Sequence, residues 1–254
     1  MNLFICLLLV MTGCQRDKGF SLKKVSSKHL PSPEWDVASP SEVLEKVTKM
    51  PYTYLGSGNH TYAFVSEDGQ YVIKFFKQKH MRTKELFLSQ KKIQRRIKER
   101  EDSFTSYKIA YEKLKEETGL VYLHLNKTSD LHLALTLIDQ HGKSFQLNLD
   151  DMEFLIQKKA TLAFDHLRFL IKEEKYDEAN TAISSLLKVV AKRNQKGIYD
   201  RDLQFFKNFG FLDGEAIEID IGEFRIDKSP APLEEELEML QHQIQDFLQK
   251  LGTD

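Results

Sequence analysis

Four short segments of the sequence contain residue types that suit phosphate and divalent-metal chemistry. In chain order they are Gly56-Ser57-Gly58, Val72-Ile73-Lys74, Asp200-Arg201-Asp202-Leu203 with Asn208, and Asp220-Ile221-Gly222. Glycines let backbone N–H groups approach a phosphate because no Cβ intrudes. Carboxylate and amide oxygens are the ligands that Mg²⁺ prefers. The segments therefore indicate phosphate and metal binding, provided that the fold brings them together.

The order of the segments resembles that of the protein kinases. Gly56-Ser57-Gly58 resembles the glycine-rich loop, and Val72-Ile73-Lys74 resembles the strand that carries the phosphate-binding lysine. Asp200-Arg201-Asp202-Leu203 resembles the catalytic-loop motif His-Arg-Asp-Leu, with an aspartate in the place of the histidine. Asp220-Ile221-Gly222 resembles the motif Asp-Phe-Gly. The resemblance covers residues 52–224.

The resemblance implies ATP and Mg²⁺ as cofactors and a role for each of these residues. The implied roles are phosphate binding by Gly56, Gly58 and Lys74, metal binding by Asn208 and Asp220, and proton acceptance from a substrate hydroxyl by Asp202. Asp200 is an alternative base. A kinase also pairs its strand lysine with a helix carboxylate, for which the candidates are Glu85, Glu99, Glu101 and Glu112.

Three departures from the kinase pattern favour binding over catalysis. The third glycine of the loop is absent, Asn208 stands one residue later than the pattern expects, and too few residues follow Gly222 for an activation segment and a full large lobe. We therefore expect a kinase-like binding or scaffold protein that is non-catalytic or weakly active. The alternatives are an active small kinase that transfers phosphate from ATP to a hydroxyl, and an unrelated α+β surface lipoprotein.

The elements that position these segments follow from the hydrophobic pattern. Alternation over residues 52–76 predicts three antiparallel strands with turns at 56–59 and 67–70. The pattern then predicts a basic helix over 78–100, a second helix over 103–118, and strands over 120–125 and 132–138. They predict a five-stranded antiparallel small lobe over residues 52–145, with residues 139–142 at the hinge.

The second half of the chain predicts a truncated, mainly helical large lobe over residues 146–228, so that the fold class is α+β and kinase-like. Helices are expected from Asp150 or Asp151 to about Lys172 and from Tyr176 to Asn194. Residues 229–254 begin with a segment that contains Pro230 and Pro232, after which the pattern predicts an amphipathic helix over 233–251. We expect this helix to dock on the body, and dimerisation through it is the alternative.

The N-terminus predicts export and lipidation. Residues 3–11 form an apolar run about 14 Å long as a helix, too short for a bilayer but suited to a signal peptide over residues 1–13. Met11-Thr12-Gly13-Cys14 resembles a bacterial lipobox, which implies a lipidated Cys14 and residues 14–51 as a polar tether. Together with the kinase-like body, this is similar to a bacterial lipoprotein of the chlamydia type. Such a protein would be anchored to the membrane outside the cytoplasm, and cytoplasmic if the signal is not used.

Composition limits the other classes of function. Charged residues make up 30% of the 254 residues and the formal net charge is −1, which disfavours nucleic acid as a partner. The basic stretch over 78–100 is interpreted as solvated surface, with attraction to anionic lipid as an alternative. Cys6 and Cys14 are the only cysteines, so the body holds neither a disulfide nor a cysteine-based zinc site.

Overall fold

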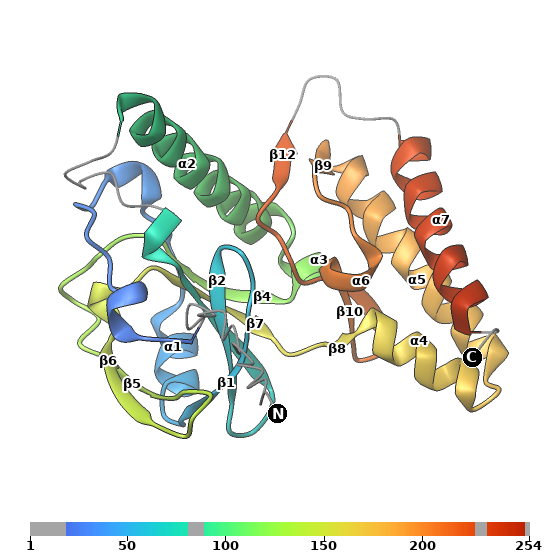
Figure 1. The fold of residues 1–254 in the computed structure, drawn as a ribbon, viewed down its shortest axis with the longest axis horizontal. Coiled ribbons are helices and arrows are strands. Elements are labelled where there is room, and N and C mark those ends of the chain that lie inside the picture. Colours follow the sequence, from blue (N-terminus) through green and yellow to red (C-terminus); the bar gives the residue numbers. More distant parts are fainter. Residues whose placement is uncertain (1–18, 81–88, 227–232, 252–254) are drawn as a thin grey trace, which may run out of the picture.

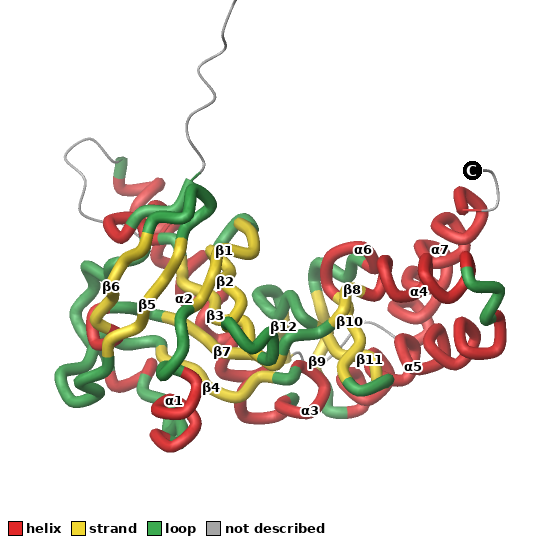
Figure 2. Tube along the Cα trace, turned by 90° about the horizontal axis from the view of Figure 1, so that it is seen from below, coloured by secondary structure: helices red, strands yellow, loops and turns green. Residues whose placement is uncertain are grey.

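The chain folds into two lobes, one built on a large β-sheet and the other mainly on helices (Figure 1). The structure, a computed structural model, describes residues 19–80, 89–226 and 233–251. Viewed from below, the strands of the large sheet gather in one half and the helices α4, α5, α6 and α7 in the other (Figure 2). The α+β class expected from the hydrophobic pattern is confirmed.

The sheet of the first lobe has seven strands in the order β4-β7-β3-β2-β1-β5-β6. Its strands are β1 (Tyr52–Ser57), β2 (Thr61–Ser66), β3 (Tyr71–Phe76), β4 (Leu120–His124), β5 (Ala134–Ile138), β6 (Ser144–Asn148) and β7 (Phe154–Lys158). Neighbours are antiparallel except β1 and β5, which run parallel. The three predicted strands over 52–76 are present, and Lys74 lies on β3 as expected.

The predicted five-stranded antiparallel sheet and its hinge are corrected by this topology. β5 pairs with β1 at the opposite side of the sheet from β4, and it forms a hairpin with β6. Residues 139–142 are the turn of that hairpin. The strand between β4 and β3 is β7, where a helix was predicted, and the first lobe therefore continues to Lys158 rather than ending at residue 145.

The segment before β1 packs onto the first lobe. It contains η1 (Leu22–Lys24), η2 (Pro33–Trp35) and α1 (Ser41–Val47). Phe20 makes an edge-to-face contact with Phe64 at 4.8 Å, and Trp35 makes one with Phe104 at 5.3 Å. Burying each such ring contributes about 1.5–3 kcal/mol. Its composition predicted a polar tether, but Phe20, Val25, Trp35, Leu44 and Val47 are buried in the core, while Leu30 is exposed.

One long helix, α2 (Gln90–Lys113), replaces the two helices predicted over 78–118. It is continuous because the sequence holds no proline or glycine between its two predicted halves. The first half is mostly exposed, and the second half is buried against β3 and β4 through Phe104, Tyr107 and Ala110. The short η3 (Gln78–His80) precedes it, and α3 (Lys115–Thr118) follows and ends at Gly119, in the left-handed region.

The second lobe consists of helices around two small sheets, in the orders β11-β10-β8 and β12-β9. After η4 (Leu149–Asp151), its elements are β8 (Thr161–Leu162), α4 (Ala163–Lys172), α5 (Tyr176–Gln195), β9 (Ile198–Asp200), α6 (Phe205–Asn208), β10 (Phe209–Leu212), β11 (Glu215–Glu218), β12 (Phe224–Ile226) and α7 (Leu233–Leu251). The apolar face of α7, with Leu240, Ile244 and Phe247, packs into the core of this lobe. Within the described ranges, no helix combines the length and apolarity needed to cross a bilayer.

Candidate functional site

The loop between β9 and β10 is held by its own polar side chains. The Asp200 carboxylate accepts a hydrogen bond from the backbone N–H of Asp202 at 3.0 Å, and Asn208 Nδ2 donates to the Asp202 carbonyl at 2.5 Å. Asn208 Nδ2 also lies 3.5 Å from Asp200 Oδ2. The predicted catalytic-loop residues therefore form one contiguous cluster.

The side-chain oxygen of Asn208 is available for a ligand. Asn208 is 3% exposed, and Oδ1 has no hydrogen-bond partner among the described residues. The Asn208 carbonyl accepts from the backbone N–H of Ile219 at 2.6 Å, which brings the following residue, the exposed Asp220, alongside. A buried amide oxygen without a described partner, close to an exposed carboxylate, is a donor set that fits Mg²⁺.

Lys74 reaches this cluster from the first lobe. Its ammonium group donates to the Ile219 carbonyl at 2.6 Å, so that β3 meets the residue before Asp220. Burial lowers the pKa of Lys74 from its ordinary value, and the negative charge of Asp220 opposes this. The structure thus brings together four predicted residues from both lobes, namely Lys74, Asp202, Asn208 and Asp220.

Asp202 and Asp200, the two candidate bases, differ in exposure. Asp202 is exposed, and its carboxylate accepts a hydrogen bond from Gln204 Nε2 at 2.5 Å. Asp200 is buried, and burial raises its pKa to about 6 even though hydrogen bonds and Arg193 favour its ionised form. A substrate could reach Asp202, whereas the Asp200 carboxylate is occupied in shaping the loop.

No described carboxylate of α2 forms an ion pair or hydrogen bond with Lys74. Glu99 pairs with Arg95 at 3.4 Å, Glu101 and Glu112 are exposed, and Glu85 lies outside the described residues. The kinase-type pairing is therefore not formed by any of the three described candidates.

Ser106 and Tyr107 stand on the face of α2 that meets the site. Ser106 Oγ donates to the Ile221 carbonyl at 2.5 Å and accepts from the Phe224 N–H at 2.7 Å. A Cβ built on Gly222 would lie 3.6 Å from Tyr107 Oη and 3.9 Å from the Asp220 carboxylate. Burial, and secondarily the charge of Asp220, raise the pKa of Tyr107. The sequence alone did not indicate these two residues.

The glycine turn joins β1 and β2, as predicted. A Cβ on Gly56 or Gly58 would meet nothing within 4 Å, so the turn presents open backbone. Lys77, a residue that sequence reasoning missed, is buried behind the turn. It donates to Ser57 Oγ at 2.7 Å and to the Gly58 carbonyl. The turn is therefore tied to the end of the strand that carries Lys74.

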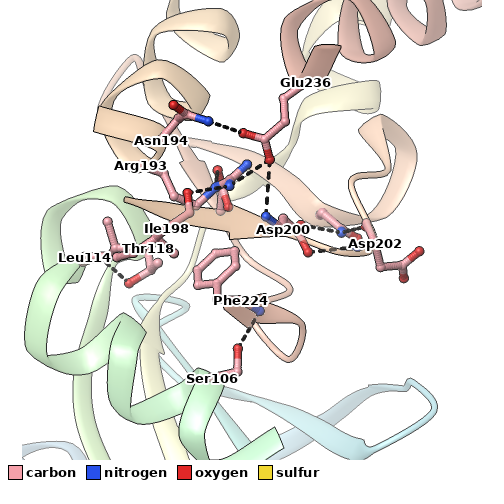
Figure 3. A network of polar contacts seen from close by, with 12 residues as sticks. Ser106, Leu114, Thr118, Arg193, Asn194, Ile198, Asp200, Asp202, Phe224 and Glu236 are labelled. Carbon is pink, nitrogen blue, oxygen red and sulfur yellow. Dashed lines mark hydrogen bonds and ion pairs between the residues drawn. The ribbon is translucent and has the colours of Figure 1, made fainter. Parts of the chain in front are cut away.

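A buried ionic network lies behind the loop (Figure 3). Arg193 of α5 is 0% exposed and contacts Glu218 of β11 at 2.8 Å and Glu236 of α7 at 3.0 Å. Glu236 also accepts a hydrogen bond from the Asp200 N–H at 3.2 Å. Burial raises the pKa of Glu218 to about 7, against the attraction of Arg193. These partners are far apart in sequence, so no motif signalled them.

A shallow cavity of about 410 Å³ lies elsewhere on the first lobe. It is lined by residues 28–31 and 127–129, and it contains none of the candidate residues. It is therefore separate from the site described above.

Comparisons with known proteins found no matching family model and no matching curated protein. Among solved structures, a crystal structure of WbdD has a TM-score of 0.43 at 16% identity, and its complex with the kinase inhibitor LY294002 has a TM-score of 0.42 at 16% identity. Both matches cover 75% of this chain and 37% of that chain. A structure of the bifunctional kinase-methyltransferase WbdD has a TM-score of 0.38 at 16% identity, and the match covers 73% and 34% of the two chains. The chain thus spans little more than a third of WbdD, and similarity at this level establishes neither its family nor its activity.

Proposed function

We propose that the chain is a kinase-like protein that binds a nucleoside triphosphate together with Mg²⁺ between its two lobes. The observation that carries the proposal is the buried side-chain oxygen of Asn208, which lacks a hydrogen-bond partner among the described residues and lies beside the strand that leads to Asp220. A buried polar atom without a partner is costly, and a bound cation would satisfy it. The order of elements also supports the proposal: three strands, a long helix and four further sheet strands precede a helical lobe.

Each residue of the site has a chemical role in this proposal. Asn208 and Asp220 would hold the cation, and Lys74 would bind phosphate oxygens once its ammonium group leaves the Ile219 carbonyl. The open backbone at Gly56 and Gly58 leaves room for phosphate. When bound, a divalent cation neutralises the charge of the phosphates and orients them.

The exposed carboxylate of Asp202 supports phosphoryl transfer to a hydroxyl. The hydroxyl oxygen would attack the terminal phosphorus, the bond from that phosphorus to the bridging oxygen would break, and Asp202 would accept the hydroxyl proton. Asp200 would keep Asp202 oriented through the hydrogen bond to its N–H.

A second candidate function is nucleotide binding without transfer. It is favoured by one observation, that no described carboxylate of α2 pairs with Lys74. Kinases need that pair to hold the lysine in its catalytic position. A kinase-like protein without it would act as a ligand-dependent binding or scaffold protein.

Thermal unfolding with and without Mg²⁺ and ATP tests the binding site. Ligand at 100 times its Kd should stabilise the protein by about 2.7 kcal/mol, or roughly 5–10 °C in Tm. Lys74→Ala and Asp220→Ala should abolish the shift, whereas Lys188→Ala and Asp246→Ala, at exposed helix positions, should retain it. An unchanged Tm of the parent at millimolar ligand would contradict the proposal. Formation of ADP by the parent, lost in Asp202→Asn, separates transfer from binding alone.

A further inference from the structure

We infer that Glu236, at the start of α7, is a positioning residue that orients the loop carrying Asp202 and Asn208. The inference deepens the proposed function and rests on it, because the loop matters only if it holds the ligand. It concerns how the site is held in shape rather than which groups touch the nucleotide.

The contacts run in one connected series from α7 to the site. Glu236 Oε1 accepts from the backbone N–H of Asp200, and the side chain of Asp200 accepts from the N–H of Asp202 at 3.0 Å. Asn208 Nδ2 closes the series by donating to the Asp202 carbonyl. Figure 3 shows successive dashed lines that join Glu236 to Asp200 and Asp200 to Asp202. Displacing the first group would therefore move the other two.

α7 also holds the loop on the far side of Asp202. Gln243 lies two helical turns after Glu236 and thus on the same face of α7. Its side chain accepts from the Phe205 N–H at 2.8 Å and donates to the Leu203 carbonyl at 3.1 Å. α7 therefore forms hydrogen bonds with the loop both before and after Asp202, while the Asp202 carboxylate itself stays exposed.

Charge fixes the position of Glu236. Its two carboxylate oxygens contact Arg193 Nη1 at 3.0 Å and Asn194 Nδ2 at 3.0 Å, both on α5. Arg193 in turn holds Glu218 and donates to the Ile198 carbonyl at 3.0 Å. A carboxylate with partners on both oxygens has one orientation, so Glu236 presents its acceptor to Asp200 at a fixed place.

The network of Arg193, Glu218 and Glu236 is not the arrangement that would give the largest free energy of unfolding. Arg193 Nη2 and Glu218 Oε2 are buried without hydrogen-bond partners among the described residues. Replacing a buried ion cluster by apolar side chains of similar volume is often neutral or stabilising. A set of buried charges with two unsatisfied atoms is better explained by the geometry that it imposes on the loop.

The amide resonance of Asp202 tests the inference without any ligand. In ¹H–¹⁵N spectra of the ligand-free protein, Glu236→Ala should move the Asp202 amide proton upfield, because its hydrogen bond to Asp200 lengthens. Glu236→Gln keeps an acceptor oxygen and should restore the parent shift. Glu238→Gln, at an exposed position on the same helix, should change nothing. An Asp202 amide that is unaffected in Glu236→Ala overturns the inference.

A charge-free variant separates positioning from folding. The triple variant Arg193→Met, Glu218→Leu and Glu236→Leu removes all three charges and should therefore fold. It replaces Glu236→Ala as the test protein if that single variant does not fold. We expect it to bind Mn²⁺–ATP, followed by the electron paramagnetic resonance of Mn²⁺, roughly 10- to 100-fold more weakly than the parent. A folded triple variant with parental affinity and a parental Asp202 amide overturns the inference. If the parent itself binds no Mn²⁺–ATP, the proposed function fails, and the amide shifts still decide the role of Glu236.

Discussion

At the scale of single residues, Asn208 shows why an amide is needed where a carboxylate would also bind metal. Its Nδ2 donates to the Asp202 carbonyl and approaches the Asp200 carboxylate, while its Oδ1 has no described partner. An aspartate could not donate to that carbonyl, and its charge would face Asp200. The amide alone supplies a donor to the loop and an oxygen to a cation.

Asp150 provides a pH-dependent test at the same scale, away from the site. Its carboxylate accepts from Thr128 Oγ1 at 2.5 Å and from the N–H groups of Leu131 and His132 at 3.1 Å. Burial alone would raise the pKa of Asp150, but these hydrogen bonds outweigh it and lower the pKa below its usual value. The contribution of Asp150 to stability is therefore complete above the unfolded pKa of about 3.9 and is lost as pH falls through the folded value.

We predict that Asp150→Asn lowers the free energy of unfolding by about 1–3 kcal/mol at neutral pH. The difference from the parent should shrink as the pH is lowered below about 4, because the parent then loses the same interaction. Urea unfolding at several pH values measures both effects. Asp151→Asn is the control, since that side chain is 48% exposed and its one ion pair with a described residue is to Lys127 at 2.9 Å. A constant difference down to pH 2 would contradict the prediction.

At the scale of elements, Ser106 joins α2 to the segment that follows Asp220. It donates to the Ile221 carbonyl and accepts from the Phe224 N–H, and all three residues are buried. Ser106→Ala leaves two buried backbone groups unpaired, so we expect a loss of about 1–3 kcal/mol in the free energy of unfolding. Thr105→Ala, on the exposed face of the same helix, should cost far less. Equal losses in the two variants, measured by urea unfolding, would argue against this role of Ser106.

The sequence predicts the elements around the motifs better than it predicts their neighbours in the sheet. Tyr52 to Phe76 alternates clearly, so β1, β2 and β3 were found together with the position of Lys74. β7 was predicted as helix because four of its five residues are buried on both faces, and such an apolar run carries no period of two. The partners of β5 depend on contacts between distant segments, which local pattern does not contain.

The candidate site likewise contains residues that the local sequence predicts and residues whose roles depend on contacts between distant segments. Lys74, Asp202, Asn208 and Asp220 were predicted as site residues from their type and order, and the structure places them close together. Tyr107 on α2 and Glu236 on α7 were missed because their roles arise only from packing across the lobes. In the sequence, a glutamate in an acidic first helical turn indicates only a favourable interaction with the helix N-terminus. The fold is needed to show that Glu236 pairs with Arg193, which lies 43 residues earlier.

At the scale of the whole molecule, the folded body begins much closer to Cys14 than composition suggested. Phe20 and Val25 are buried in the core of the first lobe, and Ser27 Oγ donates to the buried Glu153 at 2.5 Å. Cys14 itself lies outside the described residues. From there to Gly19 the chain can span at most roughly 17 Å. A lipid on Cys14 would therefore hold the body near the bilayer surface rather than on a long tether.

We propose that Cys14 is lipidated, and Cys6 offers a matched control because it lies within the predicted signal. In a bacterial host that processes lipoproteins, radiolabelled palmitate should be incorporated into the parent and into Cys6→Ser, but not into Cys14→Ser. The labelled proteins should also partition into the detergent phase of Triton X-114, since a buried acyl chain contributes about 0.8 kcal/mol per CH₂ group. Labelling that persists in Cys14→Ser, or that disappears in Cys6→Ser, would count against lipidation at Cys14. Parental ATP binding by Cys14→Ser would show that the anchor and the inter-lobe site act independently.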